Sequence, residues 1–446
     1  MGKVIRMREP ERRPSRNRIR QESRVVEVEQ RVEYTKSIDY VSLVLVALLV
    51  AFGLIMVYSS SYYVSQIRGE SQAYYFIKQI ISAFIGAVLM IILSNFDYHN
   101  FIAFSYDRNK LANGYYRRRP VLQKPYIWAL IGAAVSLFLV YTPIGMSVNG
   151  SRRWINLGIS IQPSEIVKIG MIIFISGSLA EFPTRIMRFW DGLVYPYLTV
   201  LLLLCAVIFF QPNFSAIVCI SIIVMCMLWI GGMRASHFTI IIVVGIIGGV
   251  FFLLMKDYRV QRIEDLVNPY NSWQLKQSLY SIGAGGIFGR GLGNSMQKLL
   301  YLPYRESDFI FAIIAEETGL VGCLILIILF ALLIWRGVMI SMNAPDRQGM
   351  ILATGVTATM AIQVVINIMV NIGLCPPTGV VLPFISYGGS SVVIFMALMG
   401  LLLNVSKQTN LSVVRARNKI PFYLEIPSDD KSGRKYNIEK KKKKRR

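Results

Sequence analysis

Long apolar stretches separated by short polar breaks dominate the hydrophobic pattern of this chain. Each stretch approaches the roughly 20 residues that an α-helix needs to cross a bilayer. One break is only Gln211-Pro212-Asn213, and its proline favours a tight reversal between two helices. The pattern predicts an all-α integral membrane protein with ten transmembrane helices, at residues 40–58, 76–94, 127–143, 164–180, 193–210, 214–231, 238–255, 309–335, 350–372 and 388–404.

Basic residues lie mainly between and beyond these stretches, and they predict the orientation. An even number of spans places both termini on one side, and residues 1–37, 96–126 and 405–446, all strongly basic, then share that side. Because basic segments stay in the cytoplasm, both termini are predicted to be cytoplasmic. The predicted units are a cytoplasmic tail at 1–37, a ten-helix domain at 38–404 with extracytoplasmic loops at 144–163, 256–308 (the large loop between spans seven and eight) and 373–387, and a cytoplasmic tail at 405–446.

Composition and charge exclude most soluble classes of protein. Apolar residues make up 54% of the chain and charged residues 16%, whereas about 25% is usual in soluble domains. The net charge of +23 suits nucleic acid or anionic lipid, and its position beside the spans favours anionic lipid and no nucleic acid. The five cysteines and two histidines show no spacing typical of disulfide frameworks or zinc sites, so no metal site of that kind is predicted.

Two charged residues, Glu165 and Lys168, stand at the start of the predicted fourth span. Three residues apart, they share one helix face. Each charge would cost about 2.5–3.5 kcal/mol in the middle of a membrane, so both are expected to face the interior of the bundle. A mutual ion pair that holds the helix in place and a polar floor for a substrate cavity are both compatible with this pattern.

Two adjacent arginines, Arg152 and Arg153, precede Trp154 at the predicted outer boundary of the membrane. Trp154 is typical of an interfacial anchor. Guanidinium groups bind phosphate and diphosphate through two parallel hydrogen bonds, so the pair predicts an anionic ligand at the outer leaflet.

A glycine-rich segment, SIGAGGIFGRGLGNSMQK at residues 281–298, contains Arg290 and Lys298. It predicts positive φ angles and a close approach of the backbone to a ligand. It lacks the ending of a phosphate-binding P-loop and the preceding strand of a dinucleotide fold, which disfavours nucleotide binding. Further on, Asp308 stands where polar sequence meets an apolar helix. Half-burial there would raise its pKa toward that of a general base, and a helix N-cap is the alternative.

Four segments together resemble one family of bacterial membrane proteins. They read NGSRRWINLG (149–158) followed by QPSE and Lys168, SLYSIGAGGIFGRGLGNSMQKLLYLP (278–303), ESDFIFAIIAEE (306–317) and PPTGVVLPFISYGGSS (376–391). The combination resembles the SEDS family of peptidoglycan glycosyltransferases, which includes FtsW, RodA and SpoVE. The glycine-rich segment with its following lysine and Tyr-Leu-Pro is more similar to FtsW or SpoVE than to RodA.

The resemblance implies an inverting glycosyltransferase that polymerises lipid II, the undecaprenyl-diphosphate-linked disaccharide-pentapeptide. The expected place is the outer face of the bacterial cytoplasmic membrane at the division septum. The expected partners are a class B penicillin-binding protein transpeptidase and other membrane proteins of division. By the same resemblance Asp308 is the base, Arg153 with Arg290 or Lys298 stabilises the diphosphate, and Arg152, Glu165, Lys168 and Ser386 contact substrate. No cofactor is implied, and a divalent cation is left open.

Other functions stay open at this stage. Ten helices with buried charges also describe a transporter that flips lipid II, and a scaffold for division proteins would need only the spans. Within the polymerases, roles in elongation or sporulation are the alternatives to septal synthesis. A carboxylate at the edge of a loop favours the polymerase, and charges inside the bundle argue against the scaffold.

Two features depart from the resemblance. Many members have an aspartate where this chain has Asn213, so this position cannot act as an acid. The basic insert at 103–124 is longer than expected, and a cytoplasmic contact or attraction to lipid is predicted for it.

Overall fold

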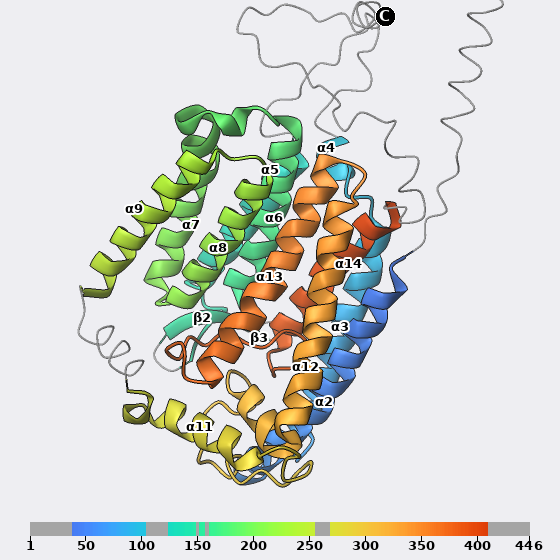
Figure 1. Ribbon diagram of the computed structural model, residues 1–446, viewed down its shortest axis with the longest axis vertical. Helices are drawn as coiled ribbons and strands as arrows, with labels where there is room; N and C mark the ends of the chain where they lie inside the picture. The colour runs from blue at the N-terminus through green and yellow to red at the C-terminus, as the bar shows by residue number, and fades with distance from the viewer. Residues whose placement is uncertain (1–37, 104–123, 149–150, 157–159, 255–267, 409–446) are drawn as a thin grey trace, which may run out of the picture.

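Long helices running roughly along one axis form the body of the molecule (Figure 1). The computed structural model describes residues 38–103, 124–148, 151–156, 160–254 and 268–408. Within these ranges, seven helices are long and apolar enough to cross a membrane. They are α2 (Tyr40–Ile67), α3 (Tyr74–Asn95), α6 (Pro163–Glu181), the continuous pair η4 (Trp190–Leu198) and α7 (Thr199–Phe210), α12 (Ile310–Met342), α13 (Arg347–Asn371) and α14 (Gly389–Gln408).

Three shorter apolar helices coincide with the other predicted spans: α5 (Pro125–Leu139), α8 (Phe214–Ile230) and α9 (Ala235–Leu254). Each apolar stretch of the sequence therefore contains a helix, and the chain is a mostly helical membrane protein. The short helices α4 (Asn100–Ala103) and η3 (Arg185–Met187) lie in the connections. The basic tails at 1–37 and 409–446, and residues 104–123 of the insert, lie outside the described residues.

Helices α6 and α14 lie at the centre of the bundle, with most of their side chains buried. Both contain small and polar residues, whereas the strongly apolar α9 is exposed along much of its length. This distribution is expected in a membrane, because lipid gives helices no hydrophobic reason to associate and small residues let them pack closely. At Gly400 of α14, for example, a Cβ would lie 2.6 Å from the carbonyl oxygen of Met90 in α3.

A small antiparallel sheet precedes α6, so the prediction of an all-α fold is wrong in this respect. Its strands are β1 (Gly145–Val148), β2 (Ser151–Asn156) and β3 (Ser160–Ile161), in the order β1-β2-β3. In a sheet, the backbone N–H and C=O groups are satisfied by the neighbouring strand, whereas a helix pairs them within itself. The dipeptide Asn149-Gly150, a strong hairpin signal, stands between the first two strands in the sequence.

The predicted large loop contains regular structure in its described part, residues 268–308. The short helix η5 (Pro269–Asn271) leads into α11 (Trp273–Gly285), which lies across the end of the bundle (Figure 1). Helix α11 packs against α12, and the remaining residues form turns that lead back to α12.

The connection between α13 and α14 does not lie on the surface as the predicted loop 373–387 would. Leu382, Phe384 and Ile385 are almost fully buried. At Gly53, in the middle of α2, a Cβ would lie 2.5 Å from the carbonyl oxygen of Phe384. The connection therefore enters the bundle, and only a glycine lets α2 approach it.

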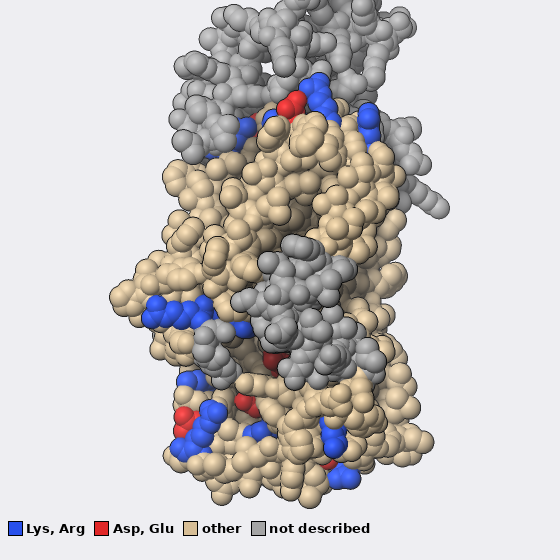
Figure 2. All heavy atoms as spheres, turned by 90° about the vertical axis from the view of Figure 1, so that its left-hand side faces the viewer, with Lys and Arg blue, Asp and Glu red and all other residues tan. Residues whose placement is uncertain are grey.

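The two ends of the described chain meet at one end of the bundle. The backbone N–H of Asp39, just before α2, donates to Ser406 Oγ in α14 at 3.2 Å. On the face shown in Figure 2, charged side chains of the described residues lie at the upper end and over the lower half, and the band between these two regions shows none. This distribution is typical of a protein whose middle faces lipid.

Candidate active site

Asp308 lies in the turn just before α12, and α13 holds its backbone in place. Its carbonyl oxygen accepts hydrogen bonds from Asn367 Nδ2 at 2.9 Å and from Asn371 Nδ2 at 3.1 Å. Asn371 Oδ1 also accepts from the N–H of Ala312, in the first turn of α12. The N-cap alternative for Asp308 is wrong, because Phe309 occupies that position and no side chain caps the helix.

The carboxyl group of Asp308 has the electrostatics of a general base. Burial raises its pKa from the usual 3.8 to about 6, and the negative charge of Glu306 adds to the shift. A hydrogen bond with Ser307 and the positive charge of Arg153 oppose it. A carboxylate with this pKa is mostly ionised at neutral pH and remains basic enough to accept a proton in a reaction.

The two adjacent arginines lie at an irregularity of the sheet. The register between β1 and β2 shifts between the pairs Met146–Trp154 and Ser147–Arg152, so the regular alternation of side chains is interrupted at Arg153. The side chain of Arg152 is exposed, and that of Arg153 is partly buried. Arg153 lies close enough to Asp308 to affect its pKa and so belongs to this site, whereas binding of one anion by both arginines stays a prediction.

Glu165 and Lys168 form a buried ion pair in the first turns of α6, with 2.5 Å between Lys168 Nζ and Glu165 Oε1. Both side chains also line a small cavity. Glu165 Oε2 is buried and has no hydrogen-bond partner among the described residues. The two interpretations made from the sequence therefore do not exclude each other, since an ion pair that holds α6 also presents an unused acceptor to a polar cavity.

The same cavity reaches the neighbourhood of Asp308. The polar residues Gln162, Asn213 and Gln363 and the segment 379–381 also line it. A Cβ placed on Gly379, whose φ is +73°, would lie 3.7 Å from Asp308 Oδ2. Segment 379–381 therefore borders both the carboxyl group of Asp308 and the cavity.

Asn213 has a structural role that an aspartate could only partly fill. Its Oδ1 accepts from the N–H of Ala216 at 3.4 Å and caps α8, and its Nδ2 donates to Ser164 Oγ at 3.2 Å. An aspartate would keep the cap but has no N–H to donate.

Ser386 is nearly fully buried, and its hydroxyl is committed to the backbone. It donates to the carbonyl oxygen of Ser307 at 2.6 Å and accepts from the N–H of Leu382 at 2.8 Å. Next to it, the N–H of Tyr387 donates to the carbonyl oxygen of Glu306 at 2.8 Å. Ser386 therefore positions the residues beside Asp308, and its direct contact with substrate stays a prediction.

The glycine-rich segment closely approaches another helix, α12, and its approach to a ligand stays a prediction. Helix α12 is interrupted at Gly319, whose φ is +69°, and residues 286–291 pair with the interrupted backbone. The N–H groups of Arg290 and Gly291 donate to the carbonyls of Glu316 and Glu317 at 2.9 and 3.0 Å. A Cβ on Gly289 would lie 2.2 Å from the Glu317 oxygen. The expectation of positive φ is confirmed at Gly286, Gly289, Gly291 and Gly293.

Two buried glutamates at this interruption organise the segment that follows. The carboxylate of Glu316 accepts from Ser281 Oγ, Ser295 Oγ and the N–H of Met296 at 3.1, 2.5 and 2.9 Å. The carboxylate of Glu317 accepts from Ser59 Oγ at 2.7 Å. A carboxylate inside an apolar helix is costly without such partners, and this cost was the signal in the sequence that could have identified both residues.

Lys298 and Arg290 contact these glutamates. Lys298 is 1% exposed, and its ammonium lies 3.2 Å from Glu317 and also donates to the carbonyl of Gly293. Arg290 lies 3.5 Å from Glu316 and its side chain is 43% exposed. Lys298 is therefore an anchor of the glycine-rich segment, and its predicted contact with a diphosphate does not fit this geometry.

The described side chains of the site supply oxygen and nitrogen atoms but do not form a cluster of metal ligands. Among the residues that the structure describes, no group of three or more His, Cys, Asp or Glu side chains could hold a metal ion. The question of a divalent cation, left open by the sequence, is not decided by these residues.

Comparison with known proteins shows the family to which this chain belongs. Residues 40–107 and 116–411 match the family model of the cell cycle proteins FtsW, RodA and SpoVE. The chain belongs to this family. The SEDS resemblance is therefore confirmed.

Members with similar sequences include stage V sporulation protein E of Bacillus subtilis, 38% identical over 376 residues that cover 83% of this chain and 97% of the relative. The probable peptidoglycan glycosyltransferase FtsW of Trichlorobacter lovleyi is 35% identical over 390 residues, covering 85% of this chain and 96% of the relative. The B. subtilis protein of that same name is 35% identical over 390 residues, which cover 83% of this chain and 91% of the relative.

Solved structures share the fold of the family. A chain from a structure described as a peptidoglycan synthase complex aligns with a TM-score of 0.66 at 22% identity, covering 84% of this chain and 99% of that chain. The rod shape determining protein RodA of Thermus thermophilus aligns with a TM-score of 0.57 at 24% identity, covering 84% and 98%.

Proposed function

We propose that this protein is a peptidoglycan glycosyltransferase that polymerises lipid II. The observation that carries the proposal is the partly buried Asp308, whose pKa is raised to about 6 and which lies near the guanidinium of Arg153. A base and a fixed cation in one place are what the transfer of a sugar from a diphosphate leaving group requires. The relatives named as probable peptidoglycan glycosyltransferases support the substrate class.

In the proposed mechanism, Asp308 accepts the proton of the acceptor sugar's 4-hydroxyl as that oxygen attacks the anomeric carbon of the donor. The diphosphate leaves from the opposite face, so the configuration inverts in a single displacement. Such a step needs one base and no covalent carboxylate, as in inverting glycosidases. The positive charge of Arg153 stabilises the negative charge that grows on the leaving diphosphate.

The pair Glu165 and Lys168 serves the substrate cavity in this proposal. Lys168 holds one oxygen of Glu165, which leaves Oε2 free to accept from a hydroxyl or amide of the bound sugar. Exclusion of bulk water strengthens such contacts. The half-exposed Arg290 and the exposed Arg152 remain available to anions outside the cavity.

We further propose ten membrane crossings with both tails, 1–37 and 405–446, in the cytoplasm. The contact between Asp39 and Ser406 places the two ends of the described chain together, as an even number of crossings requires. The sheet, α11 and Asp308 then lie on the extracytoplasmic side of a bacterial cytoplasmic membrane, with the protein at the division septum. The expected partners are a class B penicillin-binding transpeptidase, other division proteins and anionic lipids.

Incubation of the purified protein with labelled lipid II, with and without its transpeptidase partner, tests this function. Gel separation should show glycan chains of increasing length. Transport of lipid II across vesicle membranes without any polymer would contradict the proposal and support a flippase.

A role in sporulation is the second candidate. The identity to stage V sporulation protein E is 38%, whereas the identity to each of the two FtsW relatives given above is 35%. Depletion of the protein in growing cells separates the two. Filaments without septa support septal synthesis, whereas normal division with defective spores supports the other role.

Arg153→Lys is expected to lower polymerisation roughly 10-fold or more, because an ammonium cannot reproduce the planar fork that binds a diphosphate. The rate of polymerisation and the binding of lipid II are both measured in membranes with equal protein content. Arg152→Lys is the matched control, since the side chain of this neighbour is exposed whereas that of Arg153 is partly buried, and it should keep wild-type activity. Full activity of Arg153→Lys would show that only a positive charge is needed here.

Asn371→Ala is expected to lower the turnover number roughly 10- to 100-fold with little change in KM, because the backbone of Asp308 loses an anchor and the base shifts. Steady-state polymerisation at varied lipid II concentrations measures both constants. Asn404→Ala is the control: this buried asparagine donates to the carbonyls of Ser94 and Phe96, in another part of the bundle. Equal losses in both variants would indicate general damage to the fold.

A further inference from the structure

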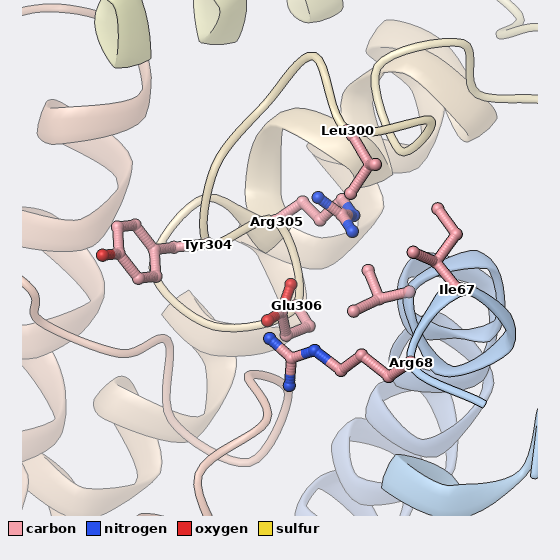
Figure 3. A pocket seen from close by; sticks show the side chains of 7 residues that line it. Ile67, Arg68, Leu300, Tyr304, Arg305 and Glu306 are labelled. Atoms are coloured by element: carbon pink, nitrogen blue, oxygen red, sulfur yellow. The ribbon is translucent and has the colours of Figure 1, made fainter. Parts of the chain in front are cut away.

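A second polar cavity lies on another side of the segment that carries Asp308. It has a volume of about 200 Å³ and is formed by the end of α2 and residues 300–306. Arg68, Arg305 and Glu306 line it together with apolar side chains that include Val64, Ile67 and Leu300. Figure 3 shows both guanidinium groups and the carboxylate facing one shared space.

The charged groups of this cavity do not form ion pairs with one another. Arg305 is 4% exposed, and its Nε has no hydrogen-bond partner among the described residues; Nη1 donates to the carbonyl of Leu302 at 3.1 Å. Glu306 Oε2 is also buried without a partner. None of the described ion pairs, at a limit of 4.0 Å, joins Glu306 to either arginine. A buried guanidinium with an unused donor favours a ligand that accepts hydrogen bonds.

The cavity lies at the same end of the bundle as the segment that carries Asp308. Helix α2 continues to Ile67, past the predicted end of the first span at residue 58, and Arg68 follows its last turn. Val64 and Ile67 give the cavity an apolar wall beside the charged groups. Since one water occupies about 30 Å³ of liquid, the space has room for a diphosphate group.

We propose that this cavity binds the diphosphate of the second of the two polyprenyl-linked sugars that the reaction joins. The proposal rests on the proposed function, since glycan polymerisation consumes two substrates that each carry a diphosphate. Arg153 serves one of them beside Asp308, and Arg68 with Arg305 serves the other. Glu306 disfavours a bare anion and favours a ligand that also brings hydrogen-bond donors, as the attached amino sugar does.

The segment between the two sites is held rigidly, which would fix one substrate relative to the other. The backbone carbonyls of Glu306 and Ser307 accept from Tyr387 N–H and Ser386 Oγ at 2.8 and 2.6 Å. Glu306 contributes to the raised pKa of Asp308 two residues away. Both sites therefore share one short stretch of backbone, and the orientation of two reactants is a large part of their reactivity.

Counting bound lipids tests the proposal. The Asp308→Asn protein, which cannot turn over, is titrated in nanodiscs with lipid II and separately with undecaprenyl diphosphate, and bound equivalents are read by native mass spectrometry. Two equivalents of lipid II are expected. Adding Arg68→Gln should weaken the second by roughly 10- to 100-fold, the range for a lost hydrogen bond to a charged group. Lys78→Gln, an exposed cation on α3 near the same end, is the matched control.

Arg305→Gln should have the same effect, but its burial also places the fold at risk, so the exposed Arg68 carries the test. One equivalent in the parent protein, or two equally tight equivalents in the Arg68 variant, would overturn the proposal. The proposal would also be overturned if Arg68→Gln weakened the binding of phosphatidylglycerol as much as that of lipid II, because the cavity would then bind ordinary lipid. Two equivalents in the Asp308→Asn protein, together with a wild-type protein that forms no polymer from lipid II, would leave the site in place and contradict the proposed function.

Discussion

Asp308→Asn is expected to abolish the formation of glycan chains while the protein remains folded in the membrane. The amide keeps the size of the side chain but cannot accept a proton, so the rate should fall on the order of 100-fold or more. Polymerisation of labelled lipid II by equal amounts of purified protein measures the loss. Asp191→Asn, which neutralises an exposed aspartate in η4, is the matched control and should be fully active.

The pH dependence gives a second measurement of the same role. With a pKa of about 6, Asp308 is increasingly protonated below that pH, so the rate should fall about tenfold per pH unit there and level off above it. Because the charge of Glu306 helps to raise this pKa, Glu306→Gln should move the acid limb to lower pH. An unchanged acid limb in that variant, or near wild-type activity of Asp308→Asn, would eliminate Asp308 as the base.

Stability should change in the opposite direction to activity. The folded state binds the Asp308 proton more tightly than the unfolded state, whose pKa is near 3.8. The stability that this proton contributes is therefore present below pH 3.8 and is lost as the pH rises through about 6. Asp308→Asn should unfold at the same or a higher temperature than the wild type at pH 7, and this excludes misfolding as the cause of its inactivity.

Lys168→Met and Glu165→Gln are each expected to lower polymerisation on the order of 100-fold, and the double variant should not recover it. Removing one partner leaves an unpaired buried charge, which typically costs 3–5 kcal/mol of stability, whereas replacing both partners often costs little. The double variant should therefore regain thermal stability without regaining activity, because the cavity still lacks its charged acceptor and donor. Unfolding temperature and polymerisation rate are measured on the same samples.

A second buried pair provides a close control. Lys124 lies 2.6 Å from Glu181 at the far end of the same helix, α6. The double variant Lys124→Met/Glu181→Gln should keep its activity as long as the protein folds. Activity recovered by the Glu165/Lys168 double variant would show that this pair only holds α6.

The sequence by itself determined where the helices lie. Hydropathy is a local property, and a bilayer requires roughly 20 apolar residues for each helix, so residues 74–95 and 163–181 could be placed almost to their ends. The same reasoning selected Asp308, Glu165 and Lys168, because a charge beside or inside an apolar segment is costly and therefore conspicuous. The sequence motifs also identified the family.

Only the tertiary structure decided what several of these residues do. Asn367 and Asn371 look like ordinary polar residues of an apolar helix, and their role depends on a turn about 60 positions earlier in the chain. The glycines of segment 281–298 suggest an approach to a ligand until the interrupted α12 is seen beside them.

The same holds for the cations. Arg152 and Arg153 are equivalent in the sequence, and only the structure shows that Arg152 is exposed whereas Arg153 is partly buried near Asp308. Lys298 resembles a ligand for phosphate until Glu317, 19 positions away, is found against it. Burial and pairing depend on residues distant in the chain, so the local pattern determined the helices and the candidate charges, and packing determined which charge meets which partner.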